Sequence, residues 1–491
     1  PAPGSERPEG MVGAHATSLV VLLLPVVAIY ATETQPKTRW YDGLEGVKVI
    51  NPAYASQHVV DDIFESQYDG QFNEQRYALL LTSGVYPKDF HIKVGYYTSV
   101  IGVGTAPSRV RLRSVTSKNG ASGHATNNFW RSFEGISLWS EGAVWAVSQG
   151  APLRRSVIEG NLLLSDAGGF SSGGFLADVK VVGRVELGSQ QQWFFRNADL
   201  QGGLGCPGGW NYVFVGVNGV SPQAAKDCRG DTPGKVSIVT HTPRIAEKPF
   251  LVQEDDGETW HIYVPAYRDT PSSGSTREGT HVDRRLRLED EVFIARPGDS
   301  DEAISQGIIG KRGLLLTPGI YRLKSPFVIR TNGFVVLGIG FPTLIATTGK
   351  PAVQVESSLS DVRIAGLLIE AGTPVGWATP VGPLLRWGTH VGAGGIASQG
   401  APGYGLPSGV LSDVFVRVGA FKYQGCAVVR SDILMEINSD DVVLDNAWVW
   451  HADHDDCGTN PEVGAYGKSD QCRSTHGLVV RGRRVTAYGL S

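Results

Sequence analysis

Two stretches of the chain are near copies of each other, LLLTSGVY at residues 79–86 and LLLTPGIY at residues 314–321. The similarity continues on both sides in the same order. Downstream, VIGVG at 100–104 corresponds to VLGIG at 336–340; upstream, VINP at 49–52 corresponds to IARP at 294–297. Each upstream run precedes a predicted short helix, over 56–66 and 299–306 respectively. Internal similarity in a constant order predicts two copies of one fold.

The remainder of each copy consists of short apolar or alternating runs that are broken by Gly, Asn and Asp. Examples are FVVLGIG at 334–340, VRIAGLLIE at 362–370 and VVLDNAWVWHA at 442–452, and 63 of the 491 residues are glycine. Gly and Asn tolerate the positive φ of a corner between sheets. The pattern therefore predicts an all-β chain of two tandem right-handed parallel β-helices of the pectate-lyase-like kind. A β-sandwich is the structural alternative, but Asn-Gly and Asp-Gly hairpin turns are few.

The predicted organisation has four parts. Residues 1–31 comprise upstream residues and a signal peptide, because LVVLLLPVVAIYA at 19–31 has the length of a signal-peptide apolar region and is too short to span a membrane. Residues 40–250 form the first β-helix and 291–491 the second. Residues 251–290, hydrophilic and of mixed charge, are expected to be a solvated linker. We expect an extracellular protein with no membrane attachment after removal of the signal.

Five cysteines are compatible with an oxidising compartment. Two pairs each bracket a loop rich in Gly, Pro and Asp, which predicts the disulfides Cys206–Cys228 and Cys457–Cys472. Cys426 would then be left over. The alternative is that all five cysteines are free thiols.

Charge excludes one class of partner. The chain has 44 Lys and Arg against 48 Asp and Glu, a formal net charge of −4, and no long basic run. A nucleic-acid partner is therefore not expected. A neutral, hydroxylated substrate suits this balance better than a polyanion does. No cofactor or metal motif is evident.

Two constellations are candidates for chemistry. In GSQQQWFFRN at 188–197, strand alternation would place Gln190 and Gln192 on one face, where their amides could position a water molecule or sugar hydroxyls, with Trp193 as a sugar-binding platform. The alternative is an amide ladder stacked inside a β-helix. In the second constellation, Trp448 and Trp450 share a face suited to a sugar, and Asp453 and His454 are candidates for acid/base roles. A solvated acidic loop is the alternative there.

Several motifs resemble those of glycoside hydrolase family 55, the β-1,3-glucanases. They are YTSVIGVG (97–104), NNFWRSFEGIS (127–137), AVSQGAPLRR (146–155), GSQQQWFFRN (188–197), ARPGDS (295–300) and GLVVRGRRVTAYGL (477–490). The resemblance implies two β-helices side by side as a rib cage, with a cleft for β-1,3-glucan between them. It also implies a cofactor-free inverting hydrolysis, in which glutamines of the QQQ strand help to hold the nucleophilic water. We expect the full-length protein to be a monomer.

One part of the family pattern is missing. The general-acid Glu of the family, and a second cleft Glu before it, follow the VTAYGL motif, whereas this sequence ends at Ser491. We therefore expect the second β-helix to be incomplete and its general acid to lie beyond Ser491. The alternative functions are a non-catalytic glycan-binding β-helix protein and a β-helix polysaccharide lyase, although a lyase needs a basic residue and no basic cluster is evident.

Overall fold

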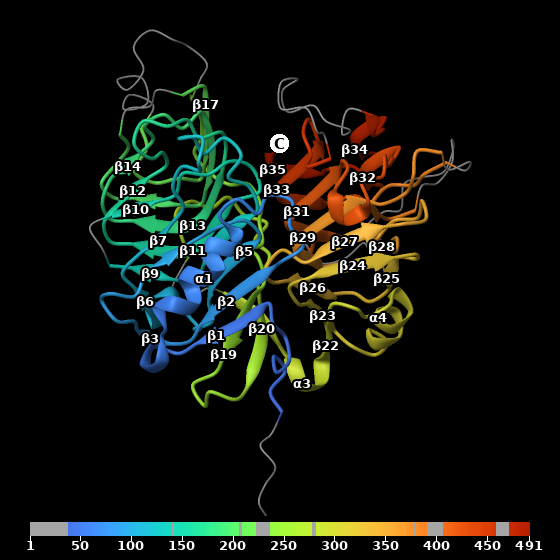
Figure 1. The fold of residues 1–491 in the computed structure, drawn as a ribbon, viewed down its shortest axis with the longest axis horizontal. Helices are drawn as coiled ribbons and strands as arrows, with labels where there is room; N and C mark the ends of the chain where they lie inside the picture. The colour runs from blue at the N-terminus through green and yellow to red at the C-terminus, as the bar shows by residue number, and fades with distance from the viewer. Residues whose placement is uncertain are drawn as a thin grey trace, which may run out of the picture. The chain divides into compact units, whose positions relative to one another are not determined.

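The computed structural model describes residues 38–139, 142–205, 209–221, 236–276, 281–376, 380–389, 406–457 and 471–491. Residues Gly43–Ser491 form one compact unit. Within it, two stacks of parallel strands lie side by side, coloured blue to green and yellow to red in Figure 1. The predicted signal peptide at 1–31 and the predicted pair Cys206–Cys228 lie outside the described residues. No helix of the described part is long and apolar enough to cross a membrane.

The first stack is built on a long parallel sheet. Its strands follow the order β1 (Val47–Ile50), β2 (Tyr77–Leu81), β5 (Thr98–Gly102), β8 (Arg131–Glu134), β11 (Pro152–Ile158), β13 (Phe175–Val181), β15 (Gln192–Arg196), β17 (Asn211–Val215) and β18 (Val236–Val239). Shorter strands complete the rungs: β3 (Gly84–Val85), β6 (Val110–Leu112) and β9 (Ser137–Leu138); β4 (Ile92–Lys93) and β7 (Val115–Thr116); β10 (Gly142–Val144), β12 (Asn161–Leu163) and β14 (Val185–Glu186); and β16 (Asp199–Leu200).

The second stack repeats this plan with longer strands. Its main sheet follows the order β22 (Val292–Ala295), β23 (Gly313–Leu316), β26 (Val335–Gly338), β29 (Val362–Ala371), β31 (Gly409–Val418), β33 (Val442–His451) and β35 (Thr486–Leu490), with β24 (Ile320–Leu323) and β27 (Thr343–Ala346) alongside. A further sheet has the order β25 (Phe327–Ile329), β28 (Val353–Val355), β30 (Leu385–Trp387), β32 (Ile433–Ile437) and β34 (His476–Val480). The chain is thus two tandem parallel β-helices.

The duplication read from the sequence is a structural duplication. Leu79 pairs with Val100 in the first copy, and the matching Leu314 pairs with Val336 in the second. The final tyrosine of each motif has the same role, because Tyr86 donates to the carbonyl of Ile50 at 2.6 Å and Tyr321 to that of Ala295 at 3.1 Å. Both predicted helices are present, as α1 (Gln57–Gln67) and α4 (Asp301–Gly307).

Corners of positive φ are stacked from rung to rung. In the second stack the paired positions are Gly366, Asp413, Asn446 and Gly489, with φ between 53° and 72°. In the first stack they are Arg155, Asp178, Asn197 and Gly216, with φ between 44° and 62°. Gly and Asn occupy such corners as predicted. Asp shares them because its short polar side chain also tolerates this conformation.

The segment between the stacks is a folded sheet, so the expected solvated linker is wrong. The strands β19 (Phe250–Gln253), β20 (Trp260–Pro265) and β21 (Val282–Arg287) pair antiparallel, and the short helix α3 (Leu288–Glu291) follows. Phe250, Val252 and Tyr263 form a buried cluster. The mixed charges concealed an alternation that gives this sheet an apolar face.

The predicted disulfide Cys457–Cys472 is also wrong. Cys457 is bonded to Cys426; the Cα atoms are 5.4 Å apart, and the two residues are 31 positions apart in sequence. Cys472 is buried nearby and accepts a hydrogen bond from the backbone N–H of Val429 at 3.4 Å. In a stack of rungs, residues about one rung apart in sequence are neighbours in space. Proximity within a loop was therefore the wrong criterion.

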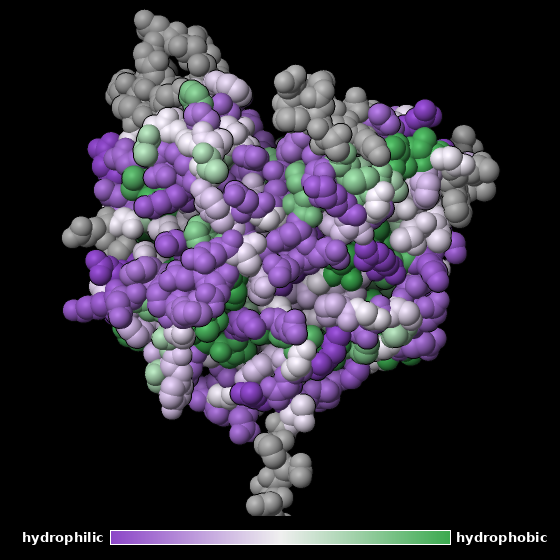
Figure 2. Space-filling model, viewed as in Figure 1, coloured by the Kyte–Doolittle hydropathy of each residue, from purple (hydrophilic) through white to green (hydrophobic). Residues whose placement is uncertain are grey.

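Hydrophilic residues cover most of the face seen in Figure 2, over both stacks, and hydrophobic residues appear there only in scattered groups. The apolar residues are instead concentrated in two main clusters, one inside each β-helix.

Candidate active site

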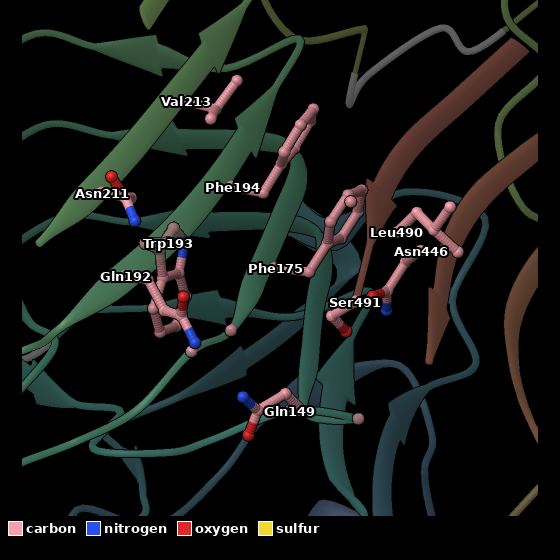
Figure 3. A pocket seen from close by; sticks show the side chains of 14 residues that line it. Gln149, Phe175, Gln192, Trp193, Phe194, Asn211, Val213, Asn446, Leu490 and Ser491 are labelled. Atoms are coloured by element: carbon pink, nitrogen blue, oxygen red, sulfur yellow. The ribbon is translucent and has the colours of Figure 1, made fainter. Parts of the chain in front are cut away.

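A pocket of about 180 Å³ lies where the end of the first stack meets the end of the second. The first stack contributes residues of β13, β15 and β17 and the loops before them, and the second contributes residues of β33 and β35 (Figure 3). The lining residues are Gln149, Gly150, Gly173, Gly174, Phe175, Gln192, Trp193, Phe194, Asn211, Val213, Asn446, Gly489, Leu490 and Ser491.

Carboxamides are the polar groups that characterise this pocket. Gln149, Gln192 and Asn211 lie on the first stack and Asn446 on the second. Among the described residues, no hydrogen bond engages the side-chain amides of the first three. None of the described lining side chains is acidic or basic. Because an amide both donates and accepts, the set suits a neutral ligand rich in hydroxyl groups.

Aromatic rings and glycines shape the rest of the wall. The rings of Phe175 and Phe194 are stacked, with centroids 5.7 Å apart and an interplanar angle of 11°. A Cβ at Gly174 would overlap the Trp193 ring, so only glycine admits that ring at this position. The wall thus joins flat apolar surfaces to spare amides, as sugar recognition requires.

The two glutamines predicted as a pair have different environments. Strand β15 begins only at Gln192, which lines the pocket. Gln190 is fully buried, and its amide bonds backbone groups: Oε1 accepts from Gly173 N–H at 2.9 Å, and Nε2 donates to the carbonyls of Val147 and Leu164 at 3.2 Å. Gln190 is therefore a buried amide inside the β-helix, as the structural alternative proposed. Gln192 is the member of the pair that a ligand can reach.

The predicted sugar platforms are largely covered by protein. Trp193 is only 3 % exposed and belongs to the core of the first stack, although it also borders the pocket. Trp448 is 7 % exposed and stacks on Trp450, with centroids 4.5 Å apart, while both rings contact Phe129 and Trp130 of the first stack. Trp448 and Trp450 thus form part of the seam between the stacks.

The aromatic residues of that seam pack against one of the residues that line the pocket. A Cβ built at Gly150, a lining residue, would lie 3.2 Å from Trp130 and 3.3 Å from Trp448. Asp453 and His454 lie further along the seam and do not line the pocket. His454 Nδ1 is 2.7 Å from Asp453 Oδ1, and its Nε2 meets the amide of Gln71 from the first stack. The structure thus brings the predicted pair together, but as a contact between the stacks.

A buried ion network beneath the pocket was not anticipated. Arg154 donates to both carboxylate oxygens of Asp413 and to Asp445, each at 2.8 Å. Arg196 joins the same Asp445 to Glu247, which lies just before β19, at 2.7–2.8 Å. Burial lowers the pKa of the Arg196 guanidinium, but Asp445 and Glu247 outweigh it and raise that pKa well above its usual value.

The only sequence signal for this network was an arginine at the end of each apolar run, APLRR and QWFFR. Both side chains cross from the first stack to the second. They therefore fix the separation of the pocket walls, since Phe175 and Phe194 belong to one stack and Asn446 to the other.

Comparisons with known proteins establish the family. Residues 292–491 match the LAM55 pectate lyase-like domain. Over 450 residues the chain is 36 % identical to an exo-β-1,3-glucanase of Streptomyces sp. (strain SirexAA-E / ActE), covering 90 % of this chain and 68 % of that protein. The chain belongs to glycoside hydrolase family 55. This confirms the family resemblance found in the sequence motifs.

Solved structures of this family have the same fold. A variant of sacteLam55A from Streptomyces sp. SirexAA-E, in complex with glucose, superposes with a TM-score of 0.77 at 34 % identity, covering 90 % of this chain and 74 % of that one. A second structure of sacteLam55A gives a TM-score of 0.75 at 33 % identity, with the same coverage. The predicted pectate-lyase-like β-helix fold is thereby confirmed.

Proposed function

We propose that this family 55 protein hydrolyses β-1,3-glucan at the pocket between its two β-helices. The observation that carries the proposal is the uncharged pocket rim, where four carboxamides surround stacked aromatic rings. The similarity of the chain to an exo-β-1,3-glucanase suggests the substrate. The wall composition agrees, because a neutral glucan presents hydroxyl groups and apolar ring faces and no charge.

The described residues divide the work of an inverting hydrolysis. In such a reaction a water molecule attacks the sugar from the face opposite the leaving group, and a carboxylic acid protonates the leaving oxygen. Gln192, which lines the pocket, would hold that water with its side-chain amide. Gln149, Asn211 and Asn446 would bind hydroxyl groups. The proton donor is assigned to a carboxyl outside the described lining, which contains none.

Incubation of the full-length protein with laminarin, a soluble β-1,3-glucan, tests the proposal directly. We expect sugar release and, by NMR of the fresh product, the anomer of inverted configuration. Binding without release would instead support the glycan-binding alternative, and unsaturated products would support a lyase. Release from another polymer but not from laminarin would overturn the substrate assignment.

The two glutamines form a matched pair of variants for this assay. Gln192→Ala should reduce hydrolysis at least 10-fold with little change in stability, because no hydrogen bond joins its side-chain amide to a described residue. Gln190→Ala should chiefly lower stability, by about 1–3 kcal/mol, because it leaves buried backbone groups unpaired. Equal effects of both variants on activity and stability would contradict this division.

An extracellular location is part of the proposal. The Cys426–Cys457 disulfide supports it, because such bonds persist in oxidising compartments. Recovery of active protein from the culture medium, with that bond intact, is the expected result. Retention of the protein with cells and reduced thiols would contradict it.

A further inference from the structure

Asn446 occupies an unusual place among the residues that line the pocket. It is a corner residue of β33 with φ of 69°, and it is the carboxamide that the second stack contributes to the pocket. Its side chain is oriented from the rung before it, since Nδ2 donates to Asp413 Oδ1 at 2.7 Å. An ionised carboxylate only accepts hydrogen bonds. Asp413 therefore orients the Asn446 amide, with Nδ2 toward Asp413 and Oδ1 away from it.

Asp413 is itself held in place. It is 2 % exposed, and it receives two hydrogen bonds from Arg154 at 2.8 Å and a contact from Lys248 at 3.4 Å. Burial raises the pKa of this carboxyl, but Arg154 and Lys248 outweigh it, and the pKa lies below its usual value. Asp413 thus stays ionised at neutral pH and keeps its acceptor character.

The corner residue on the next rung has no side chain to cover Oδ1 of the Asn446 amide. That corner is Gly489, and a Cβ there would lie 2.6 Å from the Phe175 ring and 3.7 Å from Asn446 Cα. With no side chain at that position, Asn446 faces the pocket across from Phe175 (Figure 3). Among the described residues, nothing donates to Asn446 Oδ1.

We propose that Asn446 is a substrate-recognition residue whose Oδ1 accepts a hydrogen bond from a glucosyl hydroxyl, and that Asp413 is the residue that orients it. This rests on the proposed function, because the ligand is the β-1,3-glucan of the same pocket. The relay runs from Arg154 on one stack to Asp413 and Asn446 on the other. Recognition by the second stack therefore depends on the contact that joins the stacks.

The decisive variant is Asn446→Gly. Glycine adopts the same φ without strain, so the variant removes the amide and keeps the corner. We expect affinity for β-1,3-gluco-oligosaccharides, measured by calorimetry and as KM, to fall at least 10-fold. Ser358→Gly is the control, because Ser358 is also left-handed, with φ of 65°, and does not line the pocket. It should bind as the unaltered protein does.

A double-mutant cycle separates orientation from folding. Asp413→Asn should weaken binding several-fold when Asn446 is present, because the amide can then face either way. The same change should have no further effect on binding in the background of Asn446→Gly. A merely structural Asp413 would weaken binding equally in both backgrounds, and that result would overturn the orienting role.

The outcomes separate this inference from the proposed function. If the unaltered protein binds no β-1,3-gluco-oligosaccharide, the proposed function fails and this assignment falls with it. If the unaltered protein binds the oligosaccharide and Asn446→Gly binds it as tightly, the proposed function stands and the role of Asn446 is refuted.

Discussion

The buried arginine Arg154 offers the sharpest test of how the two β-helices are held together. Its side chain is 3 % exposed, and its partners Asp413 and Asp445 are 2 % and 0 % exposed. Replacement by methionine keeps the unbranched apolar stem of the side chain but removes four hydrogen bonds to these two residues, each of 2.8–3.0 Å. Two buried carboxylates are then left without this cation.

Breaking a buried ion pair from one side costs about 3–5 kcal/mol, because the remaining charge stays desolvated. The entropy of unfolding is roughly 2 cal/mol/K per residue, or about 0.9 kcal/mol/K for the ~450 residues of the unit Gly43–Ser491. Arg154→Met should therefore lower the melting temperature by about 3–5 °C. Differential scanning calorimetry and denaturant titration both measure this change.

Two companion variants make the reasoning refutable. Arg330→Met removes an ion pair with Glu356 whose side chains are 64 % and 45 % exposed, and it should cost less than about 1 kcal/mol. Adding Asp413→Asn to Arg154→Met should recover part of the loss, because it removes one of the two buried carboxylate charges that have lost Arg154. A loss below about 1 kcal/mol for Arg154→Met, or no recovery in the double variant, would refute the account.

Three further predictions concern stability. Burial, followed by the nearby Glu247, raises the pKa of Asp178 to about 6 from 3.8, so the folded chain binds more protons between these values and stability falls as pH rises through them. Asp178→Asn should abolish that fall. Measured by denaturation across pH, the free energy of unfolding of the variant relative to the parent should be up to about 3 kcal/mol higher at pH 7 than at pH 4. An unchanged slope of stability against pH contradicts this. Peptide mapping without reduction should recover Cys426–Cys457, and Cys457→Ser should cost about 2–4 kcal/mol; a different pairing contradicts the structure. Gly174→Ala should displace the Trp193 ring, costing about 1–3 kcal/mol and altering tryptophan fluorescence; unchanged fluorescence contradicts the overlap.

Much of the fold could be predicted because its determinants are local. Alternating apolar runs specify strands, and Gly, Asn and Asp specify corners of positive φ. The repeated motif was decisive because Tyr86 and Tyr321 close the same turn in each copy, so both copies kept the same residues. The connecting sheet was missed because its mixed charges hid the apolar alternation that buries Phe250 and Tyr263.

The candidate site was predicted only in part. The QQQ segment was the right region, yet Gln190 is a buried amide and Gln192, only two positions later, is a pocket amide. No local pattern showed where β15 begins. Trp448 and Trp450 were expected on an open face, whereas the neighbouring β-helix covers most of their surface. Exposure of a side chain depends on what packs against it, and that information is not local.

By itself, the sequence determined that this protein is two copies of one parallel β-helix in a family 55 chain, because strand period, corner residues and repeated motifs are encoded over a few neighbouring residues. The tertiary structure alone decided which distant residues meet. Paired residues of adjacent rungs are 19 positions apart in sequence for Phe175 and Phe194 but 33 apart for Gly409 and Val442. Because the loops between rungs differ in length, no fixed sequence spacing identifies the partners. For this reason Cys457 joins Cys426, and Arg154 reaches Asp413 across the seam to orient Asn446 in the pocket.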